Sequence, residues 1–140
     1  MRILLDTHIL LWAAVGDPRL RGAARDVFRD RRNLLVVSVA SLWEISIKYG
    51  IGKLPLPVAP ADFFAREVAT RGYTILDVRR AHAERVAVLP YPDGGHRDPF
   101  DRMLVAQALS EGLPLLSEDS WVPSYAAHGL VLVKDLDVEE

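Results

Sequence analysis

Short apolar blocks alternate with longer amphipathic segments along the whole chain. The apolar blocks predict strands at residues 2–5, 34–37, 73–76, 113–116 and 130–133. The segments between them predict helices at residues 8–17, 21–31, 39–49, 61–70, 79–88 and from 99 onward, with a short segment at 121–127. This alternation predicts an α/β fold with a mostly parallel central sheet flanked by helices on both faces. We expect one domain over residues 1–133 and a short acidic tail over residues 134–140.

Composition narrows the class of protein. Half of the 140 residues are hydrophobic and none is cysteine, which fits a globular domain without a disulfide, a thiol nucleophile or a Cys-based zinc site. No apolar run approaches the ~20 residues of a membrane span, and Asp6 and His8 interrupt the apolar N-terminus, so a signal peptide is not expected. We expect a cytoplasmic protein. With a net charge of −2, binding to a polyanion would need local basic patches and bound metal.

Two acids directly follow predicted strands. In a parallel sheet the carboxyl ends of the strands form the active crevice, and Asp6 and Asp119 both lie at such ends. Each also has a structural interpretation as the N-cap of the next helical segment. Because Thr7 could cap the first helix instead, the functional interpretation is favoured for Asp6. Glu118 is expected to face solvent.

Glu44 lies in the apolar sequence SLWEIS, and its interpretation depends on where the helix begins. A helix that begins at Ser41 would make Glu44 part of a capping box. A helix that begins at Ser38, where the apolar strand ends, would place Glu44 in the helix interior and leave it available for function. The second interpretation is favoured.

The sequence DPFDR contains two further acids. Asp98 before Pro99 is typical of an N-cap followed by proline at the first helical position. Asp101 then occupies the third helical position, where an acid is favoured by the helix dipole but not required. Asp101 is therefore the preferred functional acid and Asp98 a helper, although the division between them stays open.

Four motifs in this order, LLDTH, SLWEIS, DPFDRMLVAQAL and GLPLLSED, resemble those of PIN-domain ribonucleases and, more narrowly, VapC toxins of bacterial toxin–antitoxin pairs. The resemblance covers nearly the whole chain and implies a PIN-like three-layer fold. It implies a metal-dependent endoribonuclease whose acids are Asp6, Glu44, Asp101 and Asp119, with hydroxyls at Thr7 and Ser117 nearby. One departure is Trp121, which stands where an acid–Phe pair is frequent in the family.

Phosphodiester hydrolysis explains why such a site needs carboxylates. Mg²⁺ or Mn²⁺ can activate water and stabilise the charge that develops on the phosphate, and such hard cations prefer oxygen ligands. We assign Asp6 and Asp101 as principal ligands. Glu44 and Asp119 would hold metal through water or orient the nucleophile, and Asp98 would assist.

The basic, aromatic and imidazole side chains say less about function than the acids do. Arg102 could bind a phosphate or pair with a neighbouring acid, and Arg97, Lys48 and Lys53 also lie close to the acids in sequence. The arginine-rich face of residues 21–32 is typical of a solvated helix. The four histidines show no ligand spacing, and Trp12 and Trp43 are interpreted as core.

The resemblance also implies partners. These are an RNA substrate, a VapB-like antitoxin with an amphipathic segment that fits a groove between early helices, and a second copy in a homodimer, with a heterotetramer or larger assembly once the antitoxin binds. The alternative is a PIN-like domain without nuclease activity that binds RNA or protein. A receiver-like domain is disfavoured because the second predicted strand ends in Ser38 and not in an aspartate that could accept a phosphate, and a nucleotide-binding domain is excluded by the absence of a Gly-rich phosphate loop after the first strand.

Overall fold

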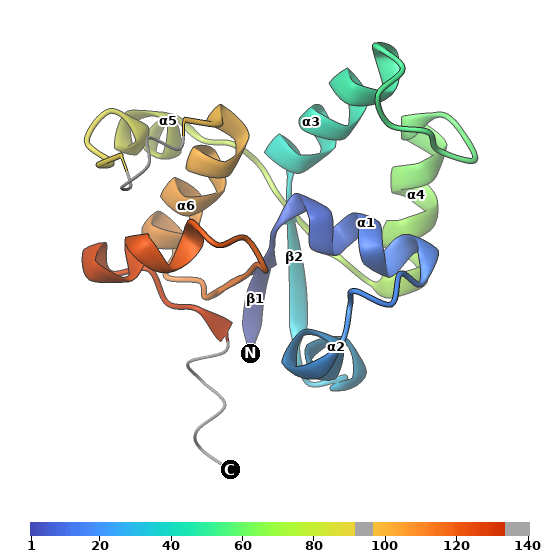
Figure 1. Ribbon diagram of the computed structural model, residues 1–140, viewed down its shortest axis with the longest axis horizontal. Helices are drawn as coiled ribbons and strands as arrows, with labels where there is room; N and C mark the ends of the chain where they lie inside the picture. Colours follow the sequence, from blue (N-terminus) through green and yellow to red (C-terminus); the bar gives the residue numbers. More distant parts are fainter. Residues whose placement is uncertain (92–96, 134–140) are drawn as a thin grey trace.

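The computed structural model describes residues 1–91 and 97–133, which form a four-stranded sheet with helices on both faces (Figure 1). The strand order is β3-β2-β1-β4. Strands β1 (Arg2–Leu5) and β2 (Leu34–Ser38) lie in the centre, and β3 (Thr74–Leu76) and β4 (Leu115–Leu116) lie at the edges. Neighbouring strands are parallel throughout this sheet, which confirms the predicted α/β class.

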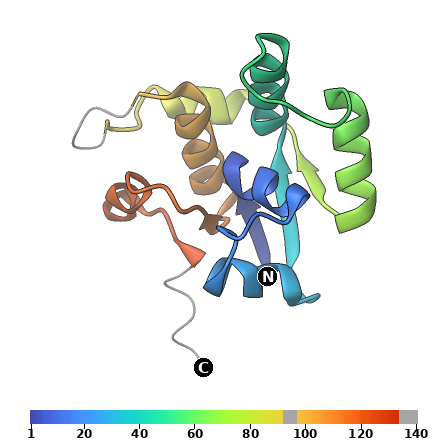
Figure 2. The same cartoon turned by 45° about the vertical axis from the view of Figure 1, so that its right-hand side comes forward.

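The helices cover the two faces of the sheet in separate groups. They are α1 (Thr7–Val15), α2 (Gly22–Arg29), α3 (Val39–Gly50), α4 (Pro60–Arg71), α5 (Arg80–Val86), α6 (Pro99–Glu111) and the 3-10 helix η1 (Val122–His128). Alternate strand residues serve the two cores: Ile3 and Leu5 pack with residues of α1 and α2, whereas Leu4 packs with residues of α6 and η1. The rotated view shows α1 and α6 on opposite sides of β1 (Figure 2).

The C-terminal strands are shorter than predicted. Strand β4 begins only at Leu115, because Pro114 has no N–H and the N–H of Leu113 donates to Ala108 O at the end of α6. The strand expected at residues 130–133 is reduced to one parallel bridge between Leu115 and Leu132. The acidic tail expected at residues 134–140 lies outside the described residues.

The connections at the carboxyl ends of the strands bring three helix N-termini to one edge. Strand β1 passes into α1 at Asp6, and β2 passes into α3 at Ser38. Helix α6 precedes the parallel strand β4 and runs in the opposite direction, so its N-terminus lies at this edge as well. Within residues 1–91 and 97–133, no helix is both long enough and apolar enough to cross a membrane.

Candidate active site

Asp6 is buried at the carboxyl end of β1 and makes two short hydrogen bonds. Its Oδ1 accepts from the Thr7 N–H at 2.7 Å and its Oδ2 accepts from the Ser117 hydroxyl at 2.6 Å. The sequence left the cap open between Asp6 and Thr7; the structure makes Asp6 the N-cap of α1 and Thr7 its first residue. Burial is the main reason that the pKa of Asp6 lies above its ordinary value, and Asp119 adds to this effect. Asp6 therefore caps α1 and also lies close to another acidic side chain.

Glu44 lies in the interior of α3, because Ser38 and not Ser41 caps that helix. The capping-box interpretation is thereby excluded. Its side chain is 7% exposed, and Oε2 accepts from Lys48 Nζ at 2.7 Å. The other oxygen, Oε1, is buried and has no hydrogen-bond partner within the described part of the chain. An unsatisfied buried carboxylate oxygen is costly, so this position favours a cation or an ordered water.

Asp98 and Asp101 lie in the first turn of α6 with separate functions. Asp98 Oδ1 accepts from the N–H groups of Phe100 (2.9 Å) and Asp101 (3.0 Å), which makes it the predicted N-cap. The pKa of Asp101 is raised to about 8, first by burial and then by its four acidic neighbours, Asp6, Asp98, Asp119 and Glu44. Five carboxylates from four parts of the chain thus act on one another.

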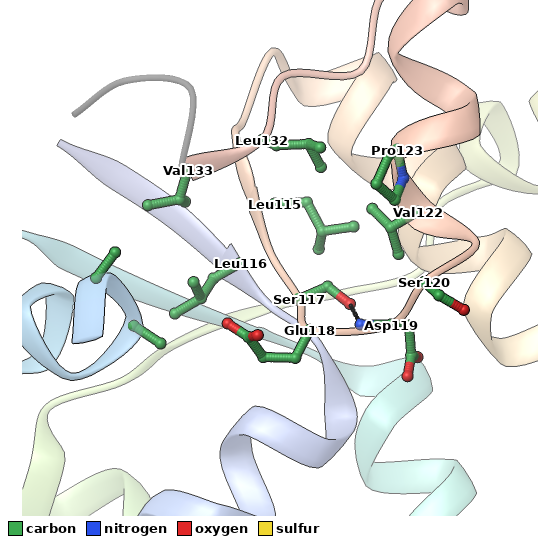
Figure 3. Close-up of a pocket in the computed structure, with 12 residues that line it drawn as sticks. Leu115, Leu116, Ser117, Glu118, Asp119, Ser120, Val122, Pro123, Leu132 and Val133 are labelled. Carbon is green, nitrogen blue, oxygen red and sulfur yellow. Dashed lines mark hydrogen bonds between the residues drawn. The ribbon is translucent and has the colours of Figure 1, made fainter. Parts of the chain in front are cut away.

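Asp119 follows β4 in a loop whose position Ser117 determines. Ser117 Oγ donates to Asp6 and accepts from the Asp119 N–H at 3.1 Å, the bond drawn in Figure 3. The Asp119 side chain is 40% exposed, more open than Asp6 and Glu44. It does not cap the following helix by its side chain, since the N-cap of η1 is Trp121. Glu118 is exposed, as expected.

His8 belongs to this cluster, although sequence reasoning did not assign it there. Its Nδ1 lies 3.6 Å from Asp6 Oδ2 and 3.7 Å from Asp119 Oδ2, and the three residues place ligand atoms within 4.8 Å of one another. Its Nε2 accepts from the Glu118 N–H at 3.2 Å, so in the neutral ring Nδ1 carries the proton and faces the two carboxylates. In this tautomer the Nδ1 proton points to the two carboxylates from just beyond hydrogen-bond distance. The available signal was its position two residues after Asp6.

Arg102 requires a correction: within residues 1–91 and 97–133, its guanidinium makes its hydrogen bonds with neutral oxygens and not with a neighbouring acid. It is 4% exposed, and its guanidinium donates to the carbonyl oxygens of Leu89 (2.7 Å) and Pro90 (3.0 Å) and to the Tyr125 hydroxyl (3.0 Å). Its carbon Cζ also lies 3.9 Å from the ring centroid of Tyr91. Arg102 therefore fastens the segment after α5 to α6 and η1.

The acids line one cavity of about 350 Å³. Its walls also contain His8, Leu11 and Trp12 of α1, Arg19 of the following loop and Lys48 of α3. The predicted supporting hydroxyl of Thr7 lines it too and contacts Ser41 Oγ at 2.8 Å, which joins α1 to α3. This cluster of carboxylate oxygens, with the His8 imidazole beside it, could hold a divalent metal ion.

A second, smaller cavity of about 160 Å³ adjoins the loop that carries Asp119. Figure 3 shows its apolar lining, which includes Leu115, Leu116, Val122 and Leu132, together with the loop of Ser117, Glu118 and Asp119. Asp119 borders both cavities, whereas Asp6 and Glu44 line only the larger one. The larger cavity is therefore the candidate active site.

One of the two tryptophans that were assigned to the core differs from this expectation. Trp43 is 62% exposed and lines an apolar groove of about 530 Å³ between α3, α5 and α6, so its assignment to the core is wrong. Trp12 is partly buried against the core, which agrees with the prediction, and its ring lies 4.8 Å from that of His8. The expected basic neighbours also separate: Arg97 lines the Trp43 groove, whereas Lys48 lines the acidic cavity.

Sequence and structure comparisons agree with this geometry. The family model described as PIN domain matches residues 3–126. Ribonuclease VapC16 of Mycobacterium tuberculosis is 33% identical, in a match that covers 57% of this chain and 72% of that protein.

Solved structures with the same fold include VapBC2 from Rickettsia felis bound to a DNA fragment from its promoter (17% identity, TM-score 0.64, covering 94% of this chain and 97% of that one). Another is VapC20 of Mycobacterium tuberculosis, a toxin that cleaves the sarcin–ricin loop (19% identity, TM-score 0.58, covering 92% and 96%). At these identities the structural likeness establishes the fold.

Proposed function

Because this chain belongs to the PIN domain family, we propose that it is a metal-dependent endoribonuclease that hydrolyses RNA phosphodiester bonds as the toxin of a VapBC-type toxin–antitoxin pair. The observation that carries this proposal is the convergence of Asp6, Glu44, Asp98, Asp101 and Asp119 in one cavity. The other four acids each raise the cost of ionising Asp101, and a bound cation would offset that cost.

Within this proposal, Asp6 and Asp101 are the principal ligands of Mg²⁺ or Mn²⁺. The bound ion would supply Lewis-acid activation of water and neutralise charge on the phosphate. The buried Oε1 of Glu44 and the more exposed carboxylate of Asp119 would hold water or orient the nucleophile. The Ser117 hydroxyl donates to Asp6 and accepts from the Asp119 N–H, and His8 Nδ1 lies 3.6 and 3.7 Å from the carboxylates of these two residues.

The test is cleavage of RNA by the purified protein with Mg²⁺ or Mn²⁺ and with a chelator, beside Asp6→Asn. We expect cleavage only with metal, and a loss of at least about 100-fold in the variant, since a principal ligand is removed. Asp26→Asn changes an exposed acid of α2 outside the cavity and serves as the matched control. Cleavage that persists with chelator or in Asp6→Asn contradicts the metal mechanism.

The alternative, a PIN-like module that binds RNA or protein without cleaving it, makes a different prediction in the same experiment. It predicts RNA binding without products at any metal concentration. The cluster of acids with a buried, unpartnered Glu44 oxygen favours the nuclease, because a binding module has no need for that arrangement.

The proposed partners are a VapB-like antitoxin and a second copy of the chain, in a heterotetramer or larger assembly, and the proposed location is cytoplasmic. Solved relatives are described as VapBC or toxin–antitoxin complexes, some with DNA. The exposed Trp43 and the apolar groove beside it provide a surface suited to a protein contact. Light scattering of the protein alone, and with the product of a neighbouring small gene, tests both assemblies.

A further inference from the structure

The acidic cavity needs a positive group that is free to meet RNA. Among the described residues that line it, the permanent cations are Arg19 and Lys48. Lys48 Nζ is held at 2.7 Å by Glu44, and the pKa of Lys48 is raised mainly by that hydrogen bond. Lys48 is thus paired with an acid of the cluster itself, whereas Arg19 is paired with Asp17, which does not line the cavity.

The Arg19 guanidinium is held in a fixed orientation at the surface. Asp17 Oδ2 accepts from Arg19 Nη2 at 2.7 Å, and Asp17 Oδ1 accepts from Nε at 3.1 Å and from the Arg19 N–H at 2.9 Å. Asp17 is itself fixed, since its N–H donates to Trp12 O at 2.9 Å just after the left-handed Gly16 that ends α1. Arg19 Cζ also lies 4.9 Å from the Trp12 ring centroid.

This arrangement leaves donors for a ligand. The side-chain hydrogen bonds of Arg19 to described residues use Nε and Nη2, so the Nη1 donors are open to an anion, and the side chain is 67% exposed. A guanidinium that is already oriented loses little further conformational freedom when it binds a phosphate.

Building on the proposed ribonuclease function, we infer that Arg19 binds a backbone phosphate of the RNA beside the one presented to the acid cluster. Asp17 and Trp12 act as positioning residues that hold its guanidinium at the rim of the cavity. The acids of the same cavity repel a polyanion, so an RNA strand that reaches them needs a cationic contact on its path, and Arg19 supplies one.

The chain contains a matched control for this inference. Asp30 and Arg32 form the same chelate, with Arg32 Nη2 to Asp30 Oδ2 at 2.8 Å and Nε to Oδ1 at 2.9 Å. Arg32 precedes β2 and therefore lies at the amino ends of the strands, away from the cavity. Arg19→Gln and Arg32→Gln each remove one exposed, carboxylate-held guanidinium, and only one of them belongs to the cavity.

The experiment is equilibrium binding of a fluorescein-labelled single-stranded RNA, followed by anisotropy over a series of KCl concentrations with Ca²⁺ in place of Mg²⁺. We expect Arg19→Gln to weaken binding about fivefold at low salt and to reduce the slope of log Kobs against log salt by about 0.7, the value for one phosphate contact on a single strand. Arg32→Gln should match the unmodified protein. Arg19→Lys keeps the positive charge but lacks the paired N–H donors of the guanidinium. It should retain the slope of log Kobs against log salt and bind RNA with intermediate affinity.

Binding does not require turnover, so this inference is tested separately from the nuclease. An unchanged slope in Arg19→Gln, an equal loss in Arg32→Gln, or no RNA binding by the unmodified protein overturns it. Arg19-dependent binding together with intact RNA in Mg²⁺ and Mn²⁺ supports the contact and overturns the proposed nuclease activity alone.

Discussion

At the scale of single residues, the site depends on carboxylates that have different surroundings. Asp98 uses its oxygen for two backbone N–H groups, whereas Asp101 is partly buried among four other acids. Identical side chains three positions apart therefore have different surroundings, and burial among other acids raises the pKa of Asp101. The same distinction separates Asp6, buried and hydrogen-bonded, from the more exposed Asp119.

Asp101 gives the chain a predictable pH dependence in the absence of metal. Its pKa rises from 3.8 to about 8 on folding, so the native state binds the extra proton, and stability from this group falls as pH rises from about 4 to about 8. Asp101→Asn removes this effect. In chelator at pH 8, the variant should have a free energy of unfolding higher by about 1–2 kcal/mol and a Tm higher by several degrees, with little change at pH 4. Thermal unfolding at both pH values measures it; an equal shift at both would contradict the linkage.

Asp98 and Asp101 should separate in a cleavage assay. Asp98→Asn keeps an oxygen that can cap α6 and should keep most of the activity, whereas Asp101→Asn should lose at least about 100-fold. Asp98→Ala should cost about 1 kcal/mol of stability, measured by urea unfolding. Full loss of cleavage in Asp98→Asn with a folded, active Asp101→Asn would reverse the assignment.

At the scale of elements, buried polar bonds hold the helices that carry the acids. Gln107 of α6 is fully buried; its Oε1 accepts from the Ser38 hydroxyl at 2.5 Å, and its Nε2 donates to Asp77 O at 3.2 Å. Ser38 caps the helix of Glu44, and Gln107 lies on the helix of Asp101. The Ser38–Gln107 bond thus joins the two helices across the sheet edge.

Gln107→Leu should therefore affect both stability and activity. It leaves the buried Ser38 hydroxyl and Asp77 carbonyl without this partner, and we expect a loss of about 2–3 kcal/mol in urea unfolding. A double-mutant cycle with Ser38→Ala should show coupling of about 1 kcal/mol, because the two residues share one hydrogen bond. Additive effects within error would show that the bond does not couple the two helices.

At the scale of the whole molecule, the parallel sheet brings distant segments to one edge. Ser117 donates to Asp6 across 111 positions of sequence, and Thr7 contacts Ser41 across 34. Because these bonds converge around one acidic cavity, a divalent cation should bind the native state and not the unfolded chain.

Metal should consequently stabilise the fold. At a Mn²⁺ or Mg²⁺ concentration of about 100 times Kd, we expect about 2.7 kcal/mol of added stability and a higher Tm. Asp6→Asn should lose most of this metal-dependent rise in Tm, and the surface variant Asp26→Asn should keep it. Equal shifts in all three proteins would place the cation elsewhere.

Much of this molecule follows from local sequence, which determined the strand–helix alternation, the Asp98-Pro99 cap and the position of Asp6 after an apolar strand. These features depend on interactions within a few residues, such as side-chain periodicity and capping. The four acids expected from the motifs lie in one cavity for a different reason: the parallel strands share a carboxyl edge, and the helices that carry Glu44 and Asp101 begin at that edge.

The surroundings of several individual side chains were decided only by the tertiary structure. Arg102 is buried among carbonyl groups of a distant segment, His8 meets Asp119, and Trp43 is exposed, because each outcome depends on segments far apart in sequence. The shortened C-terminal strands likewise depend on which backbone groups their neighbours offer. Sequence periodicity indicates which face of a helix or strand is apolar. Which other element covers that face depends on the packing of the whole chain.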